Sequence, residues 1–528
     1  MTEQKRVNPL IINDVEGLRT CLLKLDQAVH FFEHDGLLLV DTPPCDPEVT
    51  NHRDAKNPLL TLPPLPIEQL GDRAFQQTYA ARYSYYAGSM AHAISSENMV
   101  IQMGKQGFLA SFGAGGLPPA RLERAIQQII NELPHGPYAF NLIFNPNEPA
   151  LERQAVELYL QHGVNTIEAS AFLDITLPLV QYRVSGLSQL PDGSIHCANR
   201  VIAKLSRREV ASRFMQPAPQ DILDQLLQQG SISEVQASLA LHVPLANDIT
   251  VEADSGGHTD NRPLLCLLPS IISLRDEMQC RFAFEQAIRV GAAGGISTPE
   301  SALAAFSMGA AYIVTGSVNQ ACIESGASQH TRRLLAQAEM TDMTMAPAGD
   351  MFEMGVRVQV LKRGTMFPMR AQKLYELYKS HDSIESILAV ERVKIEKQIF
   401  LANLDEIWQQ TVSFFKERDA SQIERAEKDA KYRMALIFRW YLGQSSHWSN
   451  RGEKGREMDY QIWCGPSMGS FNDWVRGTSL EEPENRRVVE VARHILSGAA
   501  YLARIQMAAY CGIPLPASLH TYKLENTS

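Results

Sequence analysis

The hydrophobic positions of this 528-residue chain become regular from Arg82 onward. Short apolar segments alternate there with longer segments whose apolar positions recur every three or four residues, as in helices. Apolar strands separated by helices pair in parallel, and a set of eight favours an α/β fold of the closed (β/α)₈ (TIM) barrel type. An open doubly wound sheet is the alternative, but the GxGxxG sequence that it favours is absent. The expected strands are 83–88, 107–114, 138–144, 165–170, 201–206, 248–254, 288–290 and 312–314.

The segments that flank this barrel, which we place at 81–330, have different patterns. Residues 1–80 form an N-terminal extension, with one expected strand at 37–40 and a Pro-rich linker or arm. Residues 331–372 form a methionine-rich connecting or lid segment, which either lines a pocket for a flexible acyl chain or fills a loose contact between domains. Residues 373–528 have helical apolar spacing and hold all five tryptophans, which predicts a helical C-terminal domain packed over the barrel.

Composition narrows the classes of partner. The formal net charge of −10 argues against nucleic acid, because phosphate binding requires a basic face. The eight cysteines are scattered without a CxxC pair, which is typical of reduced thiols in a cytoplasmic protein. The N-terminus lacks the apolar core of a signal peptide, and no stretch is long enough to span a membrane. No metal site is expected, and a homodimer is one option for the oligomeric state.

Two consecutive strand ends are rich in glycine. The first strand runs into Ala292-Ala293-Gly294-Gly295, and Thr298-Pro299 then suit the start of a helix. The next strand ends in Thr315-Gly316-Ser317. Bare backbone amides beside a helix start bind phosphate, and in (β/α)₈ barrels this site usually follows strands 7 and 8. The alternative is two ordinary glycine-rich turns.

The sixth expected strand carries candidate chemistry. Strand alternation places Thr250, Glu252 and Asp254 on one face, which we expect to line the barrel interior. Buried carboxylates need a partner, and Lys204 at the end of strand 5 is the nearest candidate by topology. A purely structural ion pair is the alternative.

Further candidates lie at the same rim of the barrel. Ser255-Gly256-Gly257-His258 follows strand 6, where two glycines allow a flat ligand to approach and the imidazole to face it. Gly88 and Met90 follow strand 1, and Asn141 in strand 3 is placed to offer an amide to a heterocycle.

Together these motifs resemble a known group of flavin barrels. GSMAHAIS (88–95), EADSGGHTD (252–260), AAGGIST (292–298) and VTGS (314–317) are similar to nitronate monooxygenases and flavin enoyl reductases. NLIFNPNEPALE (141–152), IEASAFLDITLPLVQYR (167–183), FRWYLG (438–443) and DYQIWCGPSMGSFNDW (459–474) resemble one branch, the trans-acting enoyl reductases (PfaD family) of polyunsaturated fatty acid and trans-acyltransferase polyketide synthases.

The resemblance implies an FMN-dependent, NADPH-using enoyl reductase. Its substrate would be a 2-enoyl thioester on an acyl carrier protein domain, and His258 or a water that it holds would protonate the α-carbon. One departure is Asp254-Ser255 before the GGH motif, where many nitronate enzymes have Glu-Ala. The implied cofactor-binding residues are Ala87, Gly88, Met90, Asn141, Lys204, Ser255, Gly256, Gly257, Ala293, Gly294, Gly295, Thr315, Gly316 and Ser317.

Two other functions compete with this interpretation. An FMN oxygenase of the nitronate monooxygenase type would share the fold, the flavin and the histidine, but it would need neither the helical domain nor the methionine-rich segment. A flavin-binding barrel that serves mainly as a docking component of a synthase is the second rival.

Overall fold

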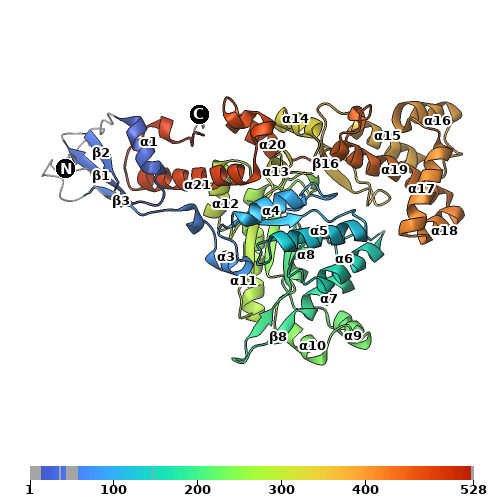
Figure 1. The fold of residues 1–528 in the computed structure, drawn as a ribbon, viewed down its shortest axis with the longest axis horizontal. Coiled ribbons are helices and arrows are strands. Elements are labelled where there is room, and N and C mark those ends of the chain that lie inside the picture. The colour runs from blue at the N-terminus through green and yellow to red at the C-terminus, as the bar shows by residue number, and fades with distance from the viewer. Residues whose placement is uncertain (1–13, 35–36, 43–57, 147, 525–528) are drawn as a thin grey trace, which may run out of the picture.

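A computed structural model describes residues 14–34, 37–42, 58–146 and 148–524. Figure 1 shows a central barrel with a small sheet and a long C-terminal helix on one side and a lobe of helices on the other. Within the described residues, no helix combines the length and the apolar character that crossing a membrane would require.

The centre of the molecule is a closed barrel of eight parallel strands, which confirms the predicted fold class. Each strand pairs with the next along the chain, and the last pairs with the first. Most observed strands are one or two residues shorter at an end than the apolar segments that predicted them, because apolar flanking residues continue into turns, whereas β13 extends three residues beyond the predicted 288–290. The strands are β4 (Tyr85–Ala87), β5 (Leu109–Phe112), β6 (Ala139–Ile143), β7 (Thr166–Ser170), β10 (Arg200–Leu205), β11 (Asp248–Glu252), β13 (Arg289–Ala293) and β14 (Ile313–Thr315).

Helices surround the barrel, and their starts follow local sequence signals. In α12 the Thr298 side chain accepts the amide of Ser301, and Pro299 occupies the first turn, as the sequence predicted. The helices are α4 (Glu97–Lys105), α5 (Pro119–Glu132), α6 (Pro149–Gln161), α7 (Leu177–Ser185), α8 (Arg208–Phe214), α11 (Leu264–Phe282), α12 (Pro299–Ser307) and α13 (Ser317–Gln320). Insertions before and after β10 add the hairpin β8 (Leu187–Gln189) and β9 (Ile195–Cys197) and the helices α9 (Gln220–Gln228) and α10 (Glu234–Ala240).

The amino end of the barrel is closed by α3 (Arg73–Tyr79). Phe75 of this helix stacks on Tyr312 with ring centroids 4.2 Å apart, and both rings belong to the apolar cluster inside the barrel. The Tyr79 hydroxyl donates to the buried Asp248 at the start of β11. The interior of the barrel at its amino end is therefore filled by side chains.

The N-terminal region contains more structure than the single strand that the sequence predicted. It consists of α1 (Val15–Leu23) and the antiparallel sheet β2-β1-β3, formed by β1 (Val29–His34), β2 (Leu37–Asp41) and β3 (Leu60–Leu62). Most of the predicted Pro-rich linker lies outside the described residues. The region packs on the C-terminal helix α21 (Val488–Tyr510), whose buried Arg504 donates to the backbone carbonyls of Leu22, Lys24, Leu25, Gln27 and Pro63.

Past the barrel the chain contributes to two apolar cores. After α14 (Gln329–Ala336), strands β15 (Met343–Pro347) and β16 (Arg357–Leu361) join the two-residue strand β12 (Gly257–His258) in a sheet. A lobe with its own core is built largely from α15 (Phe367–Ser380), α16 (Ala389–Ile395), α17 (Leu404–Arg418) and α19 (Ala430–Arg451), with α18 (Ser421–Lys428) in a small satellite cluster. Helices α20 (Ser467–Val475) and α21 return to the barrel core. The domain boundaries themselves stay a prediction.

The methionines of the connecting segment mostly face outward. Met340, Met354, Met366 and Met369 are exposed, whereas Met351 is buried. The exposed four line neither the cavity beside Arg183 and Arg289 nor the one beside Ile384 and Ile437, so these two cavities give no support to the predicted acyl-chain pocket.

Candidate functional site

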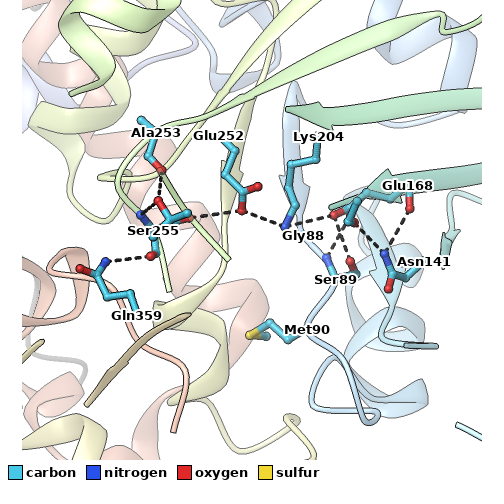
Figure 2. A network of polar contacts seen from close by, with 12 residues as sticks. Gly88, Ser89, Met90, Asn141, Glu168, Lys204, Glu252, Ala253, Ser255 and Gln359 are labelled. Carbon is cyan, nitrogen blue, oxygen red and sulfur yellow. Dashed lines mark hydrogen bonds and ion pairs between the residues drawn. The ribbon is translucent and has the colours of Figure 1, made fainter. Parts of the chain in front are cut away.

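A row of polar side chains crosses the carboxyl end of the barrel (Figure 2). Lys204, on β10, reaches the carboxylates of the two flanking strands. Its Nζ lies 3.1 Å from Glu252 Oε1 on β11 and 3.7 Å from Glu168 Oε1 on β7. Burial opposes the charge on Lys204, but the two carboxylates outweigh it and raise the pKa of this ammonium. The pairing of Lys204 with Glu252 that the sequence predicted is therefore confirmed.

Glu168 is the buried centre of this row, and sequence reasoning missed it. The hydroxyls of Tyr86 and Ser89 donate to its carboxylate, and the Ser89 amide donates to Oε2 at 3.0 Å. Asn141 Nδ2 donates to the Glu168 backbone oxygen at 3.2 Å and to Ser170 Oγ at 2.8 Å. Glu168 thus ties the loop after β4 to Lys204. A carboxylate in the middle of the apolar strand 165–170 was a usable signal, because a buried charge requires partners.

The next carboxylates along β11 behave differently from each other. Glu252 faces the barrel interior, and Ser255 Oγ donates to its Oε1 at 3.2 Å. The prediction that Asp254 also faces inward is wrong, because the strand ends at Glu252 and its alternation ends there too. Asp254 Oδ1 instead accepts from Asn261 Nδ2 at 2.9 Å and from Gln359 Nε2 at 2.8 Å.

The two glycine-rich strand ends lie side by side. β13 and β14 are neighbours, with Ala293 opposite Val314, so their carboxyl-terminal loops share one corner of the barrel mouth. Gly294 and Gly295 have φ of +81° and +78°, which only glycine adopts without strain. At Gly294 a Cβ would lie 2.6 Å from the Ala253 backbone, whereas at Gly295 and Gly316 nothing lies within 4 Å of that position. The backbone here leaves room for a phosphate group, so the residues fit the phosphate of the flavin that the sequence resemblance implies.

A segment from far along the chain packs on this corner. Gly465, which follows Cys464, donates its amide to Ser317 Oγ at 3.1 Å. Gly256 of the GGH motif faces the same segment, since a Cβ on Gly256 would lie 2.8 Å from the Cys464 amide nitrogen. A side chain at Gly256 would therefore displace the 464–465 segment, which accounts for one of the two glycines of the motif.

The residues predicted on the loop after β4 lie at the same mouth. The Gly88 amide donates to the Thr315 carbonyl at 3.0 Å, and the Met90 amide donates to Ser95 Oγ at 3.0 Å. The Met90 side chain is only partly buried and makes no polar contact with the row (Figure 2). Ala87 is fully buried, and its side chain packs in the apolar core between the strands and the helices.

His258 lies on β12 and not on the loop that the sequence predicted. His258 is paired with Val358 of β16, and its Nε2 lies 3.2 Å from Asp350 Oδ1 in the connection between β15 and β16. Burial alone would lower the pKa of His258, but the Asp350 carboxylate outweighs burial and raises it. The charged imidazole is therefore favoured at this position. No sequence pattern linked two residues so far apart in the chain.

A second histidine at the rim, His92, has the opposite electrostatics. Its ring lies parallel to Trp463, with centroids 5.6 Å apart, and meets His447 edge-on at 4.8 Å. Burial, with smaller contributions from His447 and Arg418, lowers the pKa of His92 to about 3. His92 is therefore neutral at physiological pH. In the sequence, His92 has no role of its own beyond its place in GSMAHAIS (88–95).

Two family sequence models match the chain. One is described as nitronate monooxygenase and matches residues 76–377, which include the whole barrel and the β15–β16 hairpin. The other is described as the inserted helical domain of acyl-carrier-protein S-malonyltransferase and matches residues 381–460, which include α16 to α19.

Individual proteins resemble the chain over most of its length. One component of the polyunsaturated fatty acid synthase of Thraustochytrium sp. is 47% identical over 500 residues, which are 93% of this chain and 33% of that protein. The polyketide biosynthesis protein PksE of Bacillus subtilis is 41% identical over 485 residues, 92% of this chain and 62% of that protein. The crystal structure of the enoyl reductase domain of MlnA, from the macrolactin biosynthesis cluster of Bacillus amyloliquefaciens, is 38% identical with a TM-score of 0.80. That match covers 84% of this chain and 100% of the domain.

The barrel, its glycine-rich corner and the family match define a flavin-dependent oxidoreductase. The chain belongs to the nitronate monooxygenase family and, within it, to the PfaD-like enoyl reductases. It spans less than two thirds of the length of the curated relatives described above.

Proposed function

We propose that the protein is an FMN-dependent, NADPH-using enoyl reductase. Its reaction would reduce the 2,3 double bond of an enoyl thioester carried on an acyl carrier protein. The observation that carries this proposal is the likeness, across a whole solved domain, to an enoyl reductase, combined with an imidazole that contacts the Asp350 carboxylate at the barrel mouth.

FMN is favoured over FAD by the motifs that the chain has and lacks. The loops at Gly295 and Gly316 leave open space in which a terminal phosphate can approach the backbone amides. The chain has no GxGxxG sequence of the kind that binds an adenosine dinucleotide. We therefore assign Ala293, Gly294, Gly295, Thr315, Gly316 and Ser317 to the phosphate, and Ala87, Gly88, Met90, Asn141, Lys204, Ser255, Gly256 and Gly257 to the surroundings of the ring.

Each part of the site has a task in this reaction. An FMN held at this mouth would supply the hydride chemistry between NADPH and the β-carbon of the enoyl thioester. Lys204, fixed between Glu252 and Glu168, places a positive charge at the mouth of the barrel. His258 supplies the proton that the α-carbon needs, which general acid catalysis makes faster by about 10²–10⁴-fold.

The carrier as substrate partner is supported by the names of the relatives. The two curated proteins are described as a component of a polyunsaturated fatty acid synthase and a polyketide biosynthesis protein. The helices at 381–460 resemble a domain inserted in an enzyme that acts on acyl carrier protein. We infer that the acyl chain reaches this protein while attached to a carrier domain of a synthase.

Two half-reactions under anaerobic conditions test the proposal. Flavin absorbance should be lost on mixing with NADPH, and should return on mixing the reduced enzyme with a 2-enoyl thioester on a carrier protein. Mass spectrometry of the released cofactor should find FMN. Recovery of FAD, or reduced enzyme that an enoyl thioester does not reoxidise, would overturn the assignment.

A nitronate oxygenase is the second candidate, because the family model that matches the barrel carries that description. Such an enzyme would be reduced by a nitronate and not by NADPH, so the first half-reaction separates the two. Turnover of enoyl thioester by the isolated protein would also argue against a role in docking alone.

A further inference from the structure

Asp350 reaches His258 from outside the barrel. It lies in the connection between β15 and β16, and its Oδ1 is 3.2 Å from His258 Nε2. The same hairpin pairs with His258 through its backbone, because Val358 of β16 lies opposite this residue. One contact of the ring and one of the backbone therefore fix His258 to a segment that follows the barrel in the chain. Among the described residues, Nδ1 of His258 has no hydrogen bond, so this nitrogen is left for a ligand.

The loop that carries Asp350 is itself held in place. Arg439 of α19 donates from Nε to the Gly349 carbonyl at 2.9 Å, and its Nη1 lies 3.2 Å from Glu353 Oε1. Met351 and Phe352, which follow Asp350, are both buried. The helical lobe thus fixes the position of Asp350, and through it the orientation of His258.

The charges around His258 come from several elements. Asp350 and Glu252 of β11 favour the protonated ring, whereas burial and Lys204 of β10 oppose it. Arg439 and His258 both favour the ionised form of Asp350 and lower its pKa, although burial opposes this. Among the neighbouring groups, Asp350 therefore has the largest effect on the pKa of His258. At His92 the same carboxylate is outweighed by burial, and that ring stays neutral.

We propose that Asp350 is a positioning residue of the reaction, which holds His258 by Nε2 so that Nδ1–H is presented to the α-carbon of the substrate. This inference rests on the proposed function. As the hydride adds to the β-carbon, the Nδ1–H bond breaks and a C–H bond forms at the α-carbon. The imidazole is left neutral and is reprotonated from solvent. Asp350 keeps its charge throughout and does not touch the substrate.

The pH dependence of Asp350→Asn in the full-length flavoprotein tests this role. Protonated His258 is the active form, so the oxidation of reduced flavin by an enoyl thioester should slow as pH rises through the pKa of His258. Without the carboxylate the pKa of His258 falls. At a pH above this pKa, each unit of the fall lowers the protonated fraction of His258 about tenfold. We expect a rate loss of about tenfold or more at pH 8 that shrinks toward pH 6, with flavin reduction by NADPH unchanged.

A matched control is Asp254→Asn, which removes the same charge beside the GGH motif but contacts Asn261 and Gln359 instead of His258. Its pH midpoint should equal that of the wild type. If Asp350→Asn does not fold, Asp350→Glu is the second variant, because it keeps the charge but displaces the ring. Its pH profile should keep the midpoint of the wild type, and the oxidation of reduced flavin should be slower. An equal loss of rate at every pH in Asp350→Asn, or no loss, would overturn the proposal.

A second measurement needs no substrate. Diethyl pyrocarbonate acylates only the neutral imidazole, so the pH dependence of modification at His258, followed by mass spectrometry, reports its protonation. The midpoint should move to lower pH in Asp350→Asn. If the wild type failed to reduce enoyl thioesters but this midpoint still moved, only the proposed function would fail. An unmoved midpoint would refute the role of Asp350.

Discussion

The two ends of the barrel carry similar ionic clusters with different surroundings. At the amino end Asp248 is fully buried, and Arg289 contacts both of its oxygens at 2.7 and 2.8 Å. At the carboxyl end Lys204 joins Glu168 and Glu252, and the side chains of Lys204 and Glu252 keep 18% and 13% of their exposure. Asp248 and Glu252 lie four residues apart on the same face of β11. One strand thus serves a closed structural cluster and a cluster open to ligands, and α3 makes the difference by filling the amino end.

The largest expected effect is at the open end. Gly295→Asp should abolish flavin retention, because it places a carboxylate where we assign the phosphate. Like charges so placed cost several kcal/mol, which corresponds to a loss of affinity on the order of 10³-fold or more. Flavin content after gel filtration measures this. Gly295→Asn has the same shape, tolerates positive φ and lacks the charge, so it should keep far more flavin. Equal loss in both variants would point to backbone strain.

His258→Ala tests catalysis at the same end. Flavin content and reduction by NADPH should be unchanged, because His258 is 28% exposed and its removal opens no cavity in the core. Oxidation of the reduced flavin by an enoyl thioester should slow by about 10²–10⁴-fold. Loss of flavin from the variant would indicate a structural role, and unchanged oxidation would mean that solvent or Lys204 delivers the proton.

At the closed end Asp248→Asn should act on stability alone. The substitution leaves the Arg289 guanidinium buried without its counter-charge, which should lower the free energy of unfolding by about 3–5 kcal/mol. Urea unfolding of the flavin-free protein measures this, and the folded fraction should keep wild-type kinetics. Asp276→Asn removes an exposed partner of Arg275 and should cost less than about 1 kcal/mol. A change in the half-reactions of Asp248→Asn would show that the amino end is coupled to the site.

The smallest effect should come from Lys204→Met. This substitution also breaks an ionic cluster, but water at the barrel mouth can solvate Glu252. We therefore expect the free energy of unfolding to fall by about 1–3 kcal/mol. Adding Glu252→Gln should recover part of the loss, which a double-mutant cycle measures. A loss as large as that of Asp248→Asn would mean that the ionic clusters at the two ends contribute equally to stability.

The local sequence was sufficient for the barrel. Eight apolar segments, the Thr298-Pro299 helix start and the pairing of Lys204 with Glu252 follow from periodicity, capping and topology, which act between near neighbours or between consecutive strands. Asp254 shows where this reasoning ends, because alternation holds only while the strand continues.

Contacts between distant segments were decided only by the tertiary structure. Asp350 meets His258 across 92 residues of chain, and Gly465 meets Ser317 across 148. Trp463 lies against His92, and the N-terminal sheet lies on α21. No periodicity or fixed spacing in the sequence identifies these pairs, because each pair depends on how preformed elements pack. Hydrophobic burial drives that packing and is not directional, so the partners of a residue follow from the shape of the whole fold.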